Sequence, residues 1–186
     1  VPSSATTLIR LRSKRPSAMA RAARCCDDRA NSSSARRGTA SSVAMTSLYN
    51  DELPPANVAA LHRRLCAPIE AAVTRSVDFA NPKTSERRLK IGYVTGDFHR
   101  QHPVNIFMLP VLLRHDHARF EVSVYHTGTM FDDYTRQARG SADHWRDVAA
   151  LDDAALQQAI IADGIDILVD LAGHTATHRL GVFAMR

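Results

Sequence analysis

The sequence predicts an α/β fold over residues 89–186, a Rossmann-like parallel sheet with flanking helices. Short apolar runs of strand length alternate there with amphipathic segments of helical length. The last run opens as a nearly continuous apolar stretch, which is typical of a strand covered on both faces. The helical segments between the runs are long enough for right-handed crossovers, which join parallel strands.

The individual elements follow from this alternation. Strands are expected at residues 89–94, 120–126, 144–148 and 165–173. Helices are expected at residues 104–114, 133–139, 153–163 and 178–185. Asp152 and Gly164 have the residue types that cap the two ends of the third helix. Pro110 predicts a kink in the first helix, because proline removes a backbone donor from the helix interior.

The residues before the sheet divide into a leader and a linker. Residues 1–43 are rich in Ser, Ala and Arg without sustained apolar periodicity, so we expect a disordered leader. A transit peptide has the same composition, and so does an artefactual reading of a GC-rich gene in the wrong frame. Residues 44–88 are expected to be a helical linker, because apolar residues recur at helical spacing from Val58 to Ile69. Pro68 is expected to end or kink that helix.

Composition argues against several classes of function. The net charge is +5, but residues 1–40 carry nine Lys/Arg against two Asp/Glu, so the remaining residues carry a net charge of −2. A nucleic-acid surface needs basic residues on the folded part, so we expect no nucleic-acid partner. No apolar run approaches the ~20 residues of a membrane helix. The cysteines (Cys25, Cys26 and Cys66) form no C-x-x-C pair, which favours the reducing cytoplasm over a disulfide framework or a zinc site.

The end of the first strand carries residues suited to catalysis. In an open parallel sheet, ligands bind beyond the carboxyl ends of the strands. Asp97, His99 and His102 lie there within six positions, and Pro103 suits the first position of a helix whose N-cap is then His102. The helix dipole disfavours an imidazolium at that place, so His102 is expected to be a neutral acceptor of a proton or hydrogen bond. Asp97 would orient it or face a substrate hydroxyl. In the plainer interpretation Asp97 caps the turn and both histidines are solvated.

A second candidate group follows the fourth strand. Gly173, His174 and Thr175 are predicted substrate-binding residues, with Gly173 allowing a tight turn or a close ligand approach and Thr175 capping the next helix. An ordinary strand–turn–helix connection would explain the same residues. His174 and His178 lack the glutamate of an H-E-x-x-H motif, so we expect no metal. The sequence also has no G-x-G-x-x-G or P-loop motif, the usual signals of redox cofactors and phosphoryl transfer.

Several motifs together resemble one known family. They are RLKIGYVTGDF at residues 88–98, HPV at 102–104, FEV at 120–122 and ADGIDILVDLAGHT at 162–175. Upstream, MTSLY at residues 45–49 and the helix after it resemble the segment that joins tetratricopeptide repeats to a catalytic region. Over about residues 45–186 the sequence is similar to the start of the catalytic region of bacterial O-linked N-acetylglucosamine transferases and SPINDLY-type proteins.

The resemblance implies a two-lobed glycosyltransferase of the GT-B type, of which residues 89–186 would be the N-terminal lobe. It implies transfer of N-acetylglucosamine from UDP-N-acetylglucosamine to Ser or Thr hydroxyls of proteins, with inversion and without a metal or other cofactor. The Asp and His of the family's D-F-x-x-H-P motif carry over to Asp97 and His102, and Pro103 and Val104 carry over as lining residues of the donor pocket. The C-terminal lobe, with the main uridine and diphosphate contacts, would lie beyond Arg186, so residues 1–186 alone are expected to be inactive.

One departure from the family pattern leaves the functional histidine open. Three residues separate Phe98 from His102, where the family has two, so His99 is the alternative. Two other functions also stay open. One is a SPINDLY-like fucosyltransferase lobe that uses GDP-fucose, and the other is a non-catalytic Rossmann-like binding module. The nucleotide sequence downstream of Arg186 would discriminate between an enzyme and a binding module.

Overall fold

A computed structural model describes residues 33–75, 79–100 and 102–185. Its centre is a four-stranded sheet in the order β3-β2-β1-β4, with every neighbouring pair parallel. The strands are β1 (Leu89–Thr95), β2 (Phe120–His126), β3 (His144–Asp147) and β4 (Ile167–Asp170). The predicted parallel α/β fold is confirmed.

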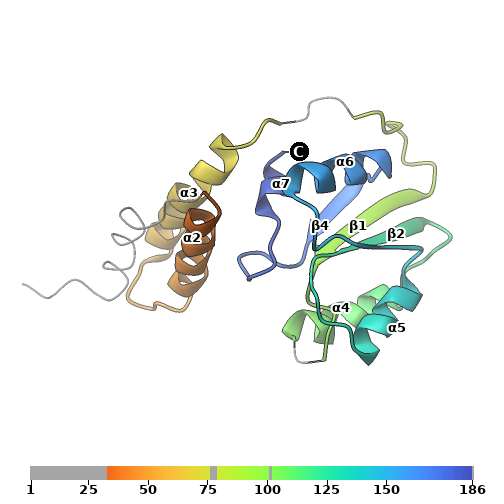
Figure 1. Ribbon diagram of the computed structural model, residues 1–186, viewed down its shortest axis with the longest axis horizontal. Coiled ribbons are helices and arrows are strands. Elements are labelled where there is room, and N and C mark those ends of the chain that lie inside the picture. The colour runs from red at the N-terminus through yellow and green to blue at the C-terminus, as the bar shows by residue number, and fades with distance from the viewer. Residues whose placement is uncertain (1–32, 76–78, 101, 186) are drawn as a thin grey trace, which may run out of the picture.

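Helices cover both faces of the sheet, with α4 and α5 on one side and α6 and α7 on the other (Figure 1). They are α4 (Pro103–Leu112), α5 (Asp133–Ser141), α6 (Asp153–Ala162) and α7 (Leu180–Ala184). Each face has its own apolar core. Phe98, Leu112 and Val122 belong to the core under α4 and α5, whereas Leu156 and Ile160 belong to the core under α6 and α7.

The predicted caps of α6 are confirmed. The Asp152 carboxylate accepts a hydrogen bond from the Ala155 amide at 2.8 Å, which satisfies one of the unpaired donors of the first turn. Gly164 follows the helix with φ of +67°, a conformation that side chains disfavour. At α4, Pro110 lies inside the helix, which ends at Leu112 rather than at residue 114.

The predicted leader boundary at residue 43 is wrong. Residues 33–47 form a helix, α2 (Ser33–Ser47), that pairs with α3 (Pro55–Ala71) in a helical hairpin beside the lobe (Figure 1). Val43 and Ala44 are buried. Sequence periodicity misses this helix because its residues are mostly small, and small residues give little apolar signal. Residues 1–32, the rest of the predicted leader, lie outside the described part of the chain.

Pro68 does not end α3, contrary to one of the two outcomes expected for it. The helix continues for three residues beyond Pro68, to Ala71. Pro68 and Arg64 both lie on the exposed side of the helix. Water can therefore reach the carbonyl group that loses its intrahelical partner. Beyond Pro68, Ile69 is buried, and α3 packs against α7.

The fourth strand is shorter and more open than predicted. β4 spans four residues, and its Ile167 side chain is 45% exposed. The continuous apolar run suggested a strand covered on both faces. Among the described residues, β4 is instead an edge strand that pairs only with β1.

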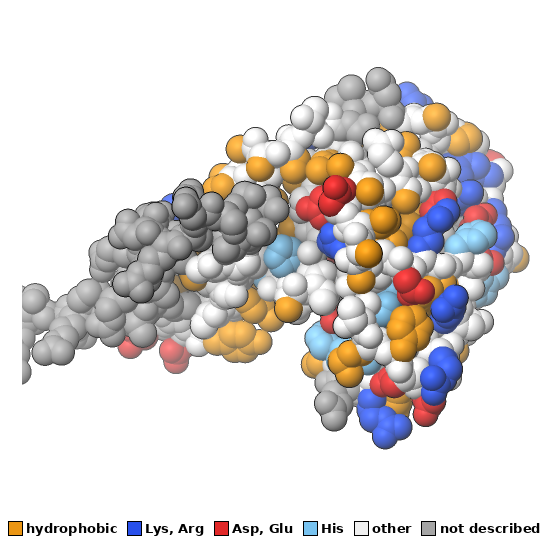
Figure 2. Space-filling model, in the orientation of Figure 1, with side chains coloured by type: hydrophobic (Ala, Val, Ile, Leu, Met, Phe, Trp, Pro, Cys, Tyr) orange, Lys and Arg blue, Asp and Glu red, His pale blue; other side chains and the backbone are white. Residues whose placement is uncertain are grey.

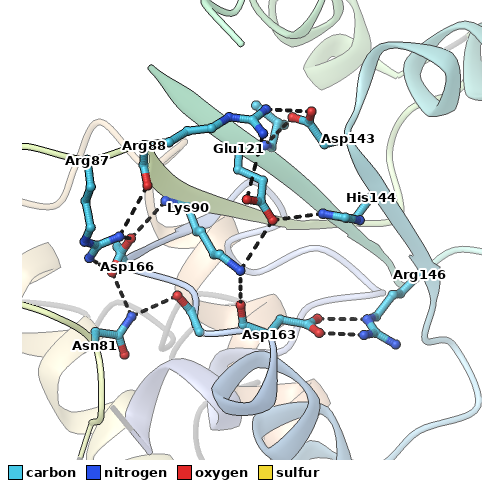
Figure 3. A network of polar contacts seen from close by, with 12 residues as sticks. Asn81, Arg87, Arg88, Lys90, Glu121, Asp143, His144, Arg146, Asp163 and Asp166 are labelled. Atoms are coloured by element: carbon cyan, nitrogen blue, oxygen red, sulfur yellow. Dashed lines mark hydrogen bonds and ion pairs between the residues drawn. The ribbon is translucent and has the colours of Figure 1, made fainter. Parts of the chain in front are cut away.

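The amino edge of the sheet is tied by a paired polar network (Figure 3). Asp166 accepts hydrogen bonds from the Arg87 guanidinium at 2.6 and 2.7 Å, the Asn81 amide at 2.7 Å and the Lys90 backbone at 2.9 Å. The Arg87 hydrogen bonds dominate and hold the pKa of Asp166 well below its usual range. These contacts hold the segment that leads into β1 next to the segment that leads into β4.

Asp143 is the second carboxylate of this edge. Its burial raises its pKa, but hydrogen bonds from the Val122 amide, Arg88 and His117 outweigh burial and lower the pKa to about 2. A carboxylate held this way ties the start of β2 to the loop before β3.

Candidate functional site

The carboxyl edge of the sheet begins with two glycines in contact. β1 and β2 are each followed by a glycine, Gly96 and Gly128, and the two backbones touch. A methyl group at Gly128 would lie 2.6 Å from the Gly96 carbonyl oxygen, and one at Gly96 would lie 2.8 Å from the Gly128 nitrogen. The Thr127 amide donates to the Thr95 carbonyl at 2.9 Å. The loops after β1 and β2 are therefore held together at their base.

His102 is the N-cap of α4, as the sequence predicts. Its backbone is extended, with φ of −99°, and its Nδ1 accepts a hydrogen bond from the Val104 amide at 3.4 Å. Nδ1 therefore carries no proton in this arrangement, and a neutral ring has its proton on Nε2. Nε2 lies 3.7 Å from Asp97 Oδ1. The ring remains one-quarter exposed, so it can be reached from solvent.

Asp97 is the buried member of this pair, with a side chain that is 8% exposed. Its amide donates to the Thr95 hydroxyl at 3.0 Å, which positions the loop. Its Oδ2 is buried and has no hydrogen-bond partner among the described residues. The distance from Oδ1 to His102 exceeds that of a formed hydrogen bond. The structure thus brings Asp97 and His102 together and leaves the carboxylate able to accept more.

His99 lies next to this pair. Its ring centroid is 5.4 Å from that of His102, and its Nδ1 is buried without a hydrogen-bond partner among the described residues. The His99 amide donates to the Asp97 carbonyl, and the His102 amide donates to the His99 carbonyl. These two turns accommodate the extra residue of the loop. They leave His102 at the helix N-terminus, where Pro103 and Val104 form the first turn.

The second predicted group is split by the fold. Gly173 makes the predicted tight turn, with φ of +54° and its amide donating to Asp170. His174 points to the hairpin instead, with Nδ1 3.2 Å from the Ser41 hydroxyl. Burial lowers the pKa of His174, and so do His62 and His178. The predicted capping role of Thr175 is wrong, because α7 begins five residues later, at Leu180, without a side-chain cap.

His126 is a site residue that the sequence analysis missed. It ends β2 and is fully buried, with ring centroids of Phe131 and Trp145 at 5.2 Å. Burial lowers the pKa of His126, against the opposing effects of Asp147 and Asp97. A signal was available, because T127-G128 directly after β2 repeats the T95-G96 pair at the end of β1.

A cavity of about 410 Å³ lies between the hairpin and the lobe. Figure 2 shows the hollow between these two parts, with histidine side chains at its border. Its lining residues are Gly38, Ile69, Thr127, Asp153, Ala176, Thr177, His178, Arg179 and Gly181. The buried hydroxyls of Thr127 and Thr177 have no hydrogen-bond partner among the described residues. The cavity lies beside the Asp97–His102 pair rather than on it.

The described part of the chain contains no group of three His, Cys, Asp or Glu side chains placed to hold a metal ion. Within the same residues, no helix is long and apolar enough to cross a membrane.

Comparison with known proteins decides the family. The model of glycosyl transferase family 41 matches residues 47–186, which is most of the chain and includes both candidate groups. The chain belongs to glycosyl transferase family 41. The predicted fold class, a Rossmann-like lobe of a GT-B glycosyltransferase, is confirmed with it.

Members of family 41 from plants and bacteria are similar to this chain. The Petunia hybrida protein named "Probable UDP-N-acetylglucosamine–peptide N-acetylglucosaminyltransferase SPINDLY" is 36% identical over 110 residues, which are 57% of this chain and 12% of that protein. An Arabidopsis thaliana protein has the same printed name with SEC in place of SPINDLY. It is 36% identical over 101 residues, which are 54% of this chain and 10% of that protein. The chain thus spans about a tenth of the length of these relatives.

A solved structure matches more of the chain. A mutant of the Thermobaculum terrenum O-GlcNAc transferase superposes with a TM-score of 0.75 at 35% identity. The match covers 81% of this chain and 29% of that one. The matched share exceeds the four-stranded lobe, so the likeness extends into the helical hairpin.

Proposed function

We propose that the chain is the N-terminal lobe of a protein O-glycosyltransferase that transfers N-acetylglucosamine from UDP-N-acetylglucosamine to Ser or Thr hydroxyls. The observation that carries the proposal is the Asp97–His102 pair at the N-terminus of α4, on the carboxyl edge of a family 41 lobe. The names of the relatives, which are peptide N-acetylglucosaminyltransferases, support this donor and this acceptor.

The first turn of α4 is the proposed donor subsite. The positive end of the α4 dipole favours a diphosphate leaving group. Pro103 and Val104 form this turn and would line the pocket for the donor. The helix terminus supplies positive potential where charge develops on the leaving oxygen, so we propose that the reaction requires no metal. The uridine would be bound mainly by a second lobe, as the GT-B architecture requires.

His102 and Asp97 are the proposed catalytic residues. In the transfer, the anomeric C–O bond to the diphosphate breaks as a new bond forms to the acceptor hydroxyl oxygen from the opposite face. The hydroxyl proton must leave during this step. The exposed ring of His102 can hydrogen-bond the donor through Nε2–H, or accept the hydroxyl proton at Nδ1 once the Val104 amide releases that nitrogen, and Asp97 would hold the ring in place. General-base participation of this kind is typically worth about 10²–10⁴-fold in rate.

The proposal is tested by assaying three proteins with radiolabelled donor and an acceptor peptide. They are residues 1–186 alone, the complete gene product, and a chimera in which residues 33–186 replace the matching 29% of the Thermobaculum terrenum transferase. We expect no turnover by residues 1–186 alone, because one wall of a cleft cannot preorganise the reacting groups. We expect turnover by the other two.

Two donors are compared in the same assay. We expect incorporation from UDP-N-acetylglucosamine and none from GDP-fucose. Incorporation from GDP-fucose alone would replace the proposed donor with that of a SPINDLY-like fucosyltransferase. A complete gene product and a chimera that are both folded yet inactive with either donor would overturn the proposal in favour of a binding module.

The proposed place of action is the cytoplasm. The three cysteines lack the spacing of a disulfide framework, and Cys66 is a free thiol. Fractionation of cells that express a tagged gene product would test this location.

A further inference from the structure

His126 has a position that the proposed mechanism does not yet use. In the sheet it is paired in register with Asp147 on β3 and with Thr95 on β1. Its side chain is fully buried, and neither ring nitrogen has a hydrogen-bond partner among the described residues. A buried polar group without a partner costs about 1–3 kcal/mol, so such a residue is expected to have a role.

The ring of His126 is held in a fixed plane. Phe131 packs edge-on against it, and Trp145 lies against it at a 31° tilt. Nδ1 faces Asp147 Oδ1 at 3.5 Å, on the β3 side. The two ring nitrogens point in widely different directions, so Nε2 points away from Asp147, and the other neighbour of β2 in the sheet is β1. Asp97 and His99, which act electrostatically on His126, are both on the loop after β1.

The two carboxylates that flank His126 differ in their need for a donor. Asp147 is half exposed, and its Oδ1 already accepts from the Trp145 indole at 2.8 Å. Water and Trp145 can satisfy it. Asp97 is 8% exposed, and its buried Oδ2 accepts from nothing in the described structure. A neutral imidazole has a single N–H, and that N–H lowers the energy most where no other donor is available.

The 3.5 Å separation between Nδ1 and Asp147 fits the same conclusion. It exceeds the usual N–H···O distance, so no formed hydrogen bond to Asp147 holds the ring proton on Nδ1. The proton of the neutral ring is then on Nε2, on the side of Asp97.

We infer that His126 is a positioning residue for the transfer reaction. Through Nε2–H and one bridging water molecule it holds the Asp97 carboxylate by Oδ2, and thereby leaves Oδ1 facing His102. The inference rests on the proposed function, because the role of His102 belongs to that proposal. It adds a third residue, from a different strand, to the pair that the sequence motif contains.

Three substitutions at His126 separate its two nitrogens. His126→Gln keeps a donor near Nε2, His126→Asn keeps one near Nδ1 only, and His126→Phe keeps the ring packing and neither donor. In the complete gene product we expect His126→Phe and His126→Asn to lower kcat by about 10–100-fold with little change in donor KM, since misplaced catalytic groups cost of that order. His126→Gln should stay within about fivefold of wild type on the same scale. Equal activity of all three variants, or a His126→Gln variant as impaired as His126→Phe, would overturn the inference.

A double-mutant cycle tests whether His126 acts through Asp97. If it does, His126→Phe should have no further effect on kcat in an Asp97→Asn background, because the two changes break the same contact. Additive effects would mean that His126 supports the site only by packing. Circular dichroism and Tm of each variant accompany the kinetics, so that loss of folding is not read as loss of positioning.

A readout without turnover keeps this inference apart from the proposed function. In the long-range ¹H–¹⁵N spectrum of the 186-residue chain, His126 should be the neutral Nε2–H tautomer. Its Nε2 signal should shift on Asp97→Asn and stay in place on Asp147→Asn. An Nδ1–H tautomer, or a response to Asp147→Asn alone, would contradict the inference even if the enzyme is active. An inactive gene product with the expected tautomer would instead count against the proposed function.

Discussion

The two edges of the sheet differ in how their buried carboxylates are paired. At the amino edge, Asp166 and Asp143 accept several hydrogen bonds each, from side chains and from the backbone (Figure 3). At the carboxyl edge, polar atoms of Asp97, His99 and His126 are buried without hydrogen-bond partners among the described residues. The same sheet therefore has one edge that contributes to stability and one that opposes it.

This difference separates structural from functional polar groups. Natural proteins satisfy nearly all of their buried polar groups, and the exceptions gather where strain or reactivity serves function. The edge that lacks partners is also the edge at which parallel sheets bind ligands. Substitutions of the unpaired polar groups at the carboxyl edge should therefore reduce activity more than stability, whereas substitutions of the paired carboxylates at the amino edge should do the reverse.

The largest effect is expected at His102. In the complete gene product, His102→Ala should lower kcat by about 10²–10⁴-fold, the usual range for general acid–base catalysis, and should leave the Tm nearly unchanged. His99→Ala is the matched control from the same loop and should be far milder. Steady-state kinetics of the two variants decide which histidine is functional. A severe loss with His99→Ala and near-normal turnover with His102→Ala would assign the role to His99.

Asp97→Asn should give the clearest case of lower activity without lower stability. We expect kcat to fall by about 10–100-fold as the orientation of His102 is lost, with no decrease in Tm, because the substitution removes a buried carboxylate oxygen that has no hydrogen-bond partner among the described residues. Asparagine preserves the shape and most capping ability of aspartate. Undiminished kcat would show that Asp97 only shapes the turn. A large drop in Tm would show that Asp97 stabilises the fold, unlike the other unpaired polar groups of the carboxyl edge.

A third prediction concerns the contact of the two glycines. Gly128→Ala should lower the unfolding free energy by about 1–3 kcal/mol, as overpacking does, because the added methyl group would lie 2.6 Å from the Gly96 carbonyl oxygen. Gly140→Ala is the control. It lies in α5 with open space around it and should be neutral or stabilising. Chemical denaturation measures both, and equal stabilities for the two variants would refute the close contact.

The smallest effects are expected at the amino edge. Asp166→Asn should lower the Tm by about 2–6 °C at neutral pH, on the scale of hydrogen bonds to a charged group, and should leave kcat unchanged. Asp133→Asn, which removes an exposed ion pair with Arg136 on α5, is the control and should have almost no effect. A lower kcat of Asp166→Asn, measured under conditions in which the variant is fully folded, would contradict the assignment of stability to the amino edge and activity to the carboxyl edge.

The stability of the folded chain should decrease as the pH falls below about 5. The pKa values of Asp166 and Asp143 are lowered in the folded chain, so their stabilisation is complete above the unfolded pKa of about 4 and is lost as the pH falls toward 2. Asp166→Asn should flatten this decline, which is measured as Tm against pH between 5 and 2.

Local patterns made much of the fold predictable. The predicted second strand matches β2 (Phe120–His126) at both ends, and the Asp152 cap of α6 is where the sequence placed it. The N-cap position of His102 followed from Pro103, a neighbouring residue. In each case the determining contacts lie within a few residues, so the sequence contains the whole argument.

Contacts between distant segments were not predictable in the same way. The ion pair of Arg87 with Asp166 spans 79 residues, and the register of His126 with Thr95 depends on β1 and β2 being neighbours. The direction of His174 was missed because it depends on Ser41 in α2, a helix whose small residues gave no apolar signal.

The contact between Gly96 and Gly128 has a mechanical consequence. Because the two backbones touch and the Thr127 amide bonds to Thr95, the loops after β1 and β2 cannot slide past one another. The two loops therefore behave as one rigid unit that is joined at the two glycines. The Thr127 side chain lines the cavity beside the hairpin, and Asp97 and His102 lie on the other loop. A displacement of the β2 loop at Thr127 is therefore expected to displace the β1 loop, which carries Asp97, as well.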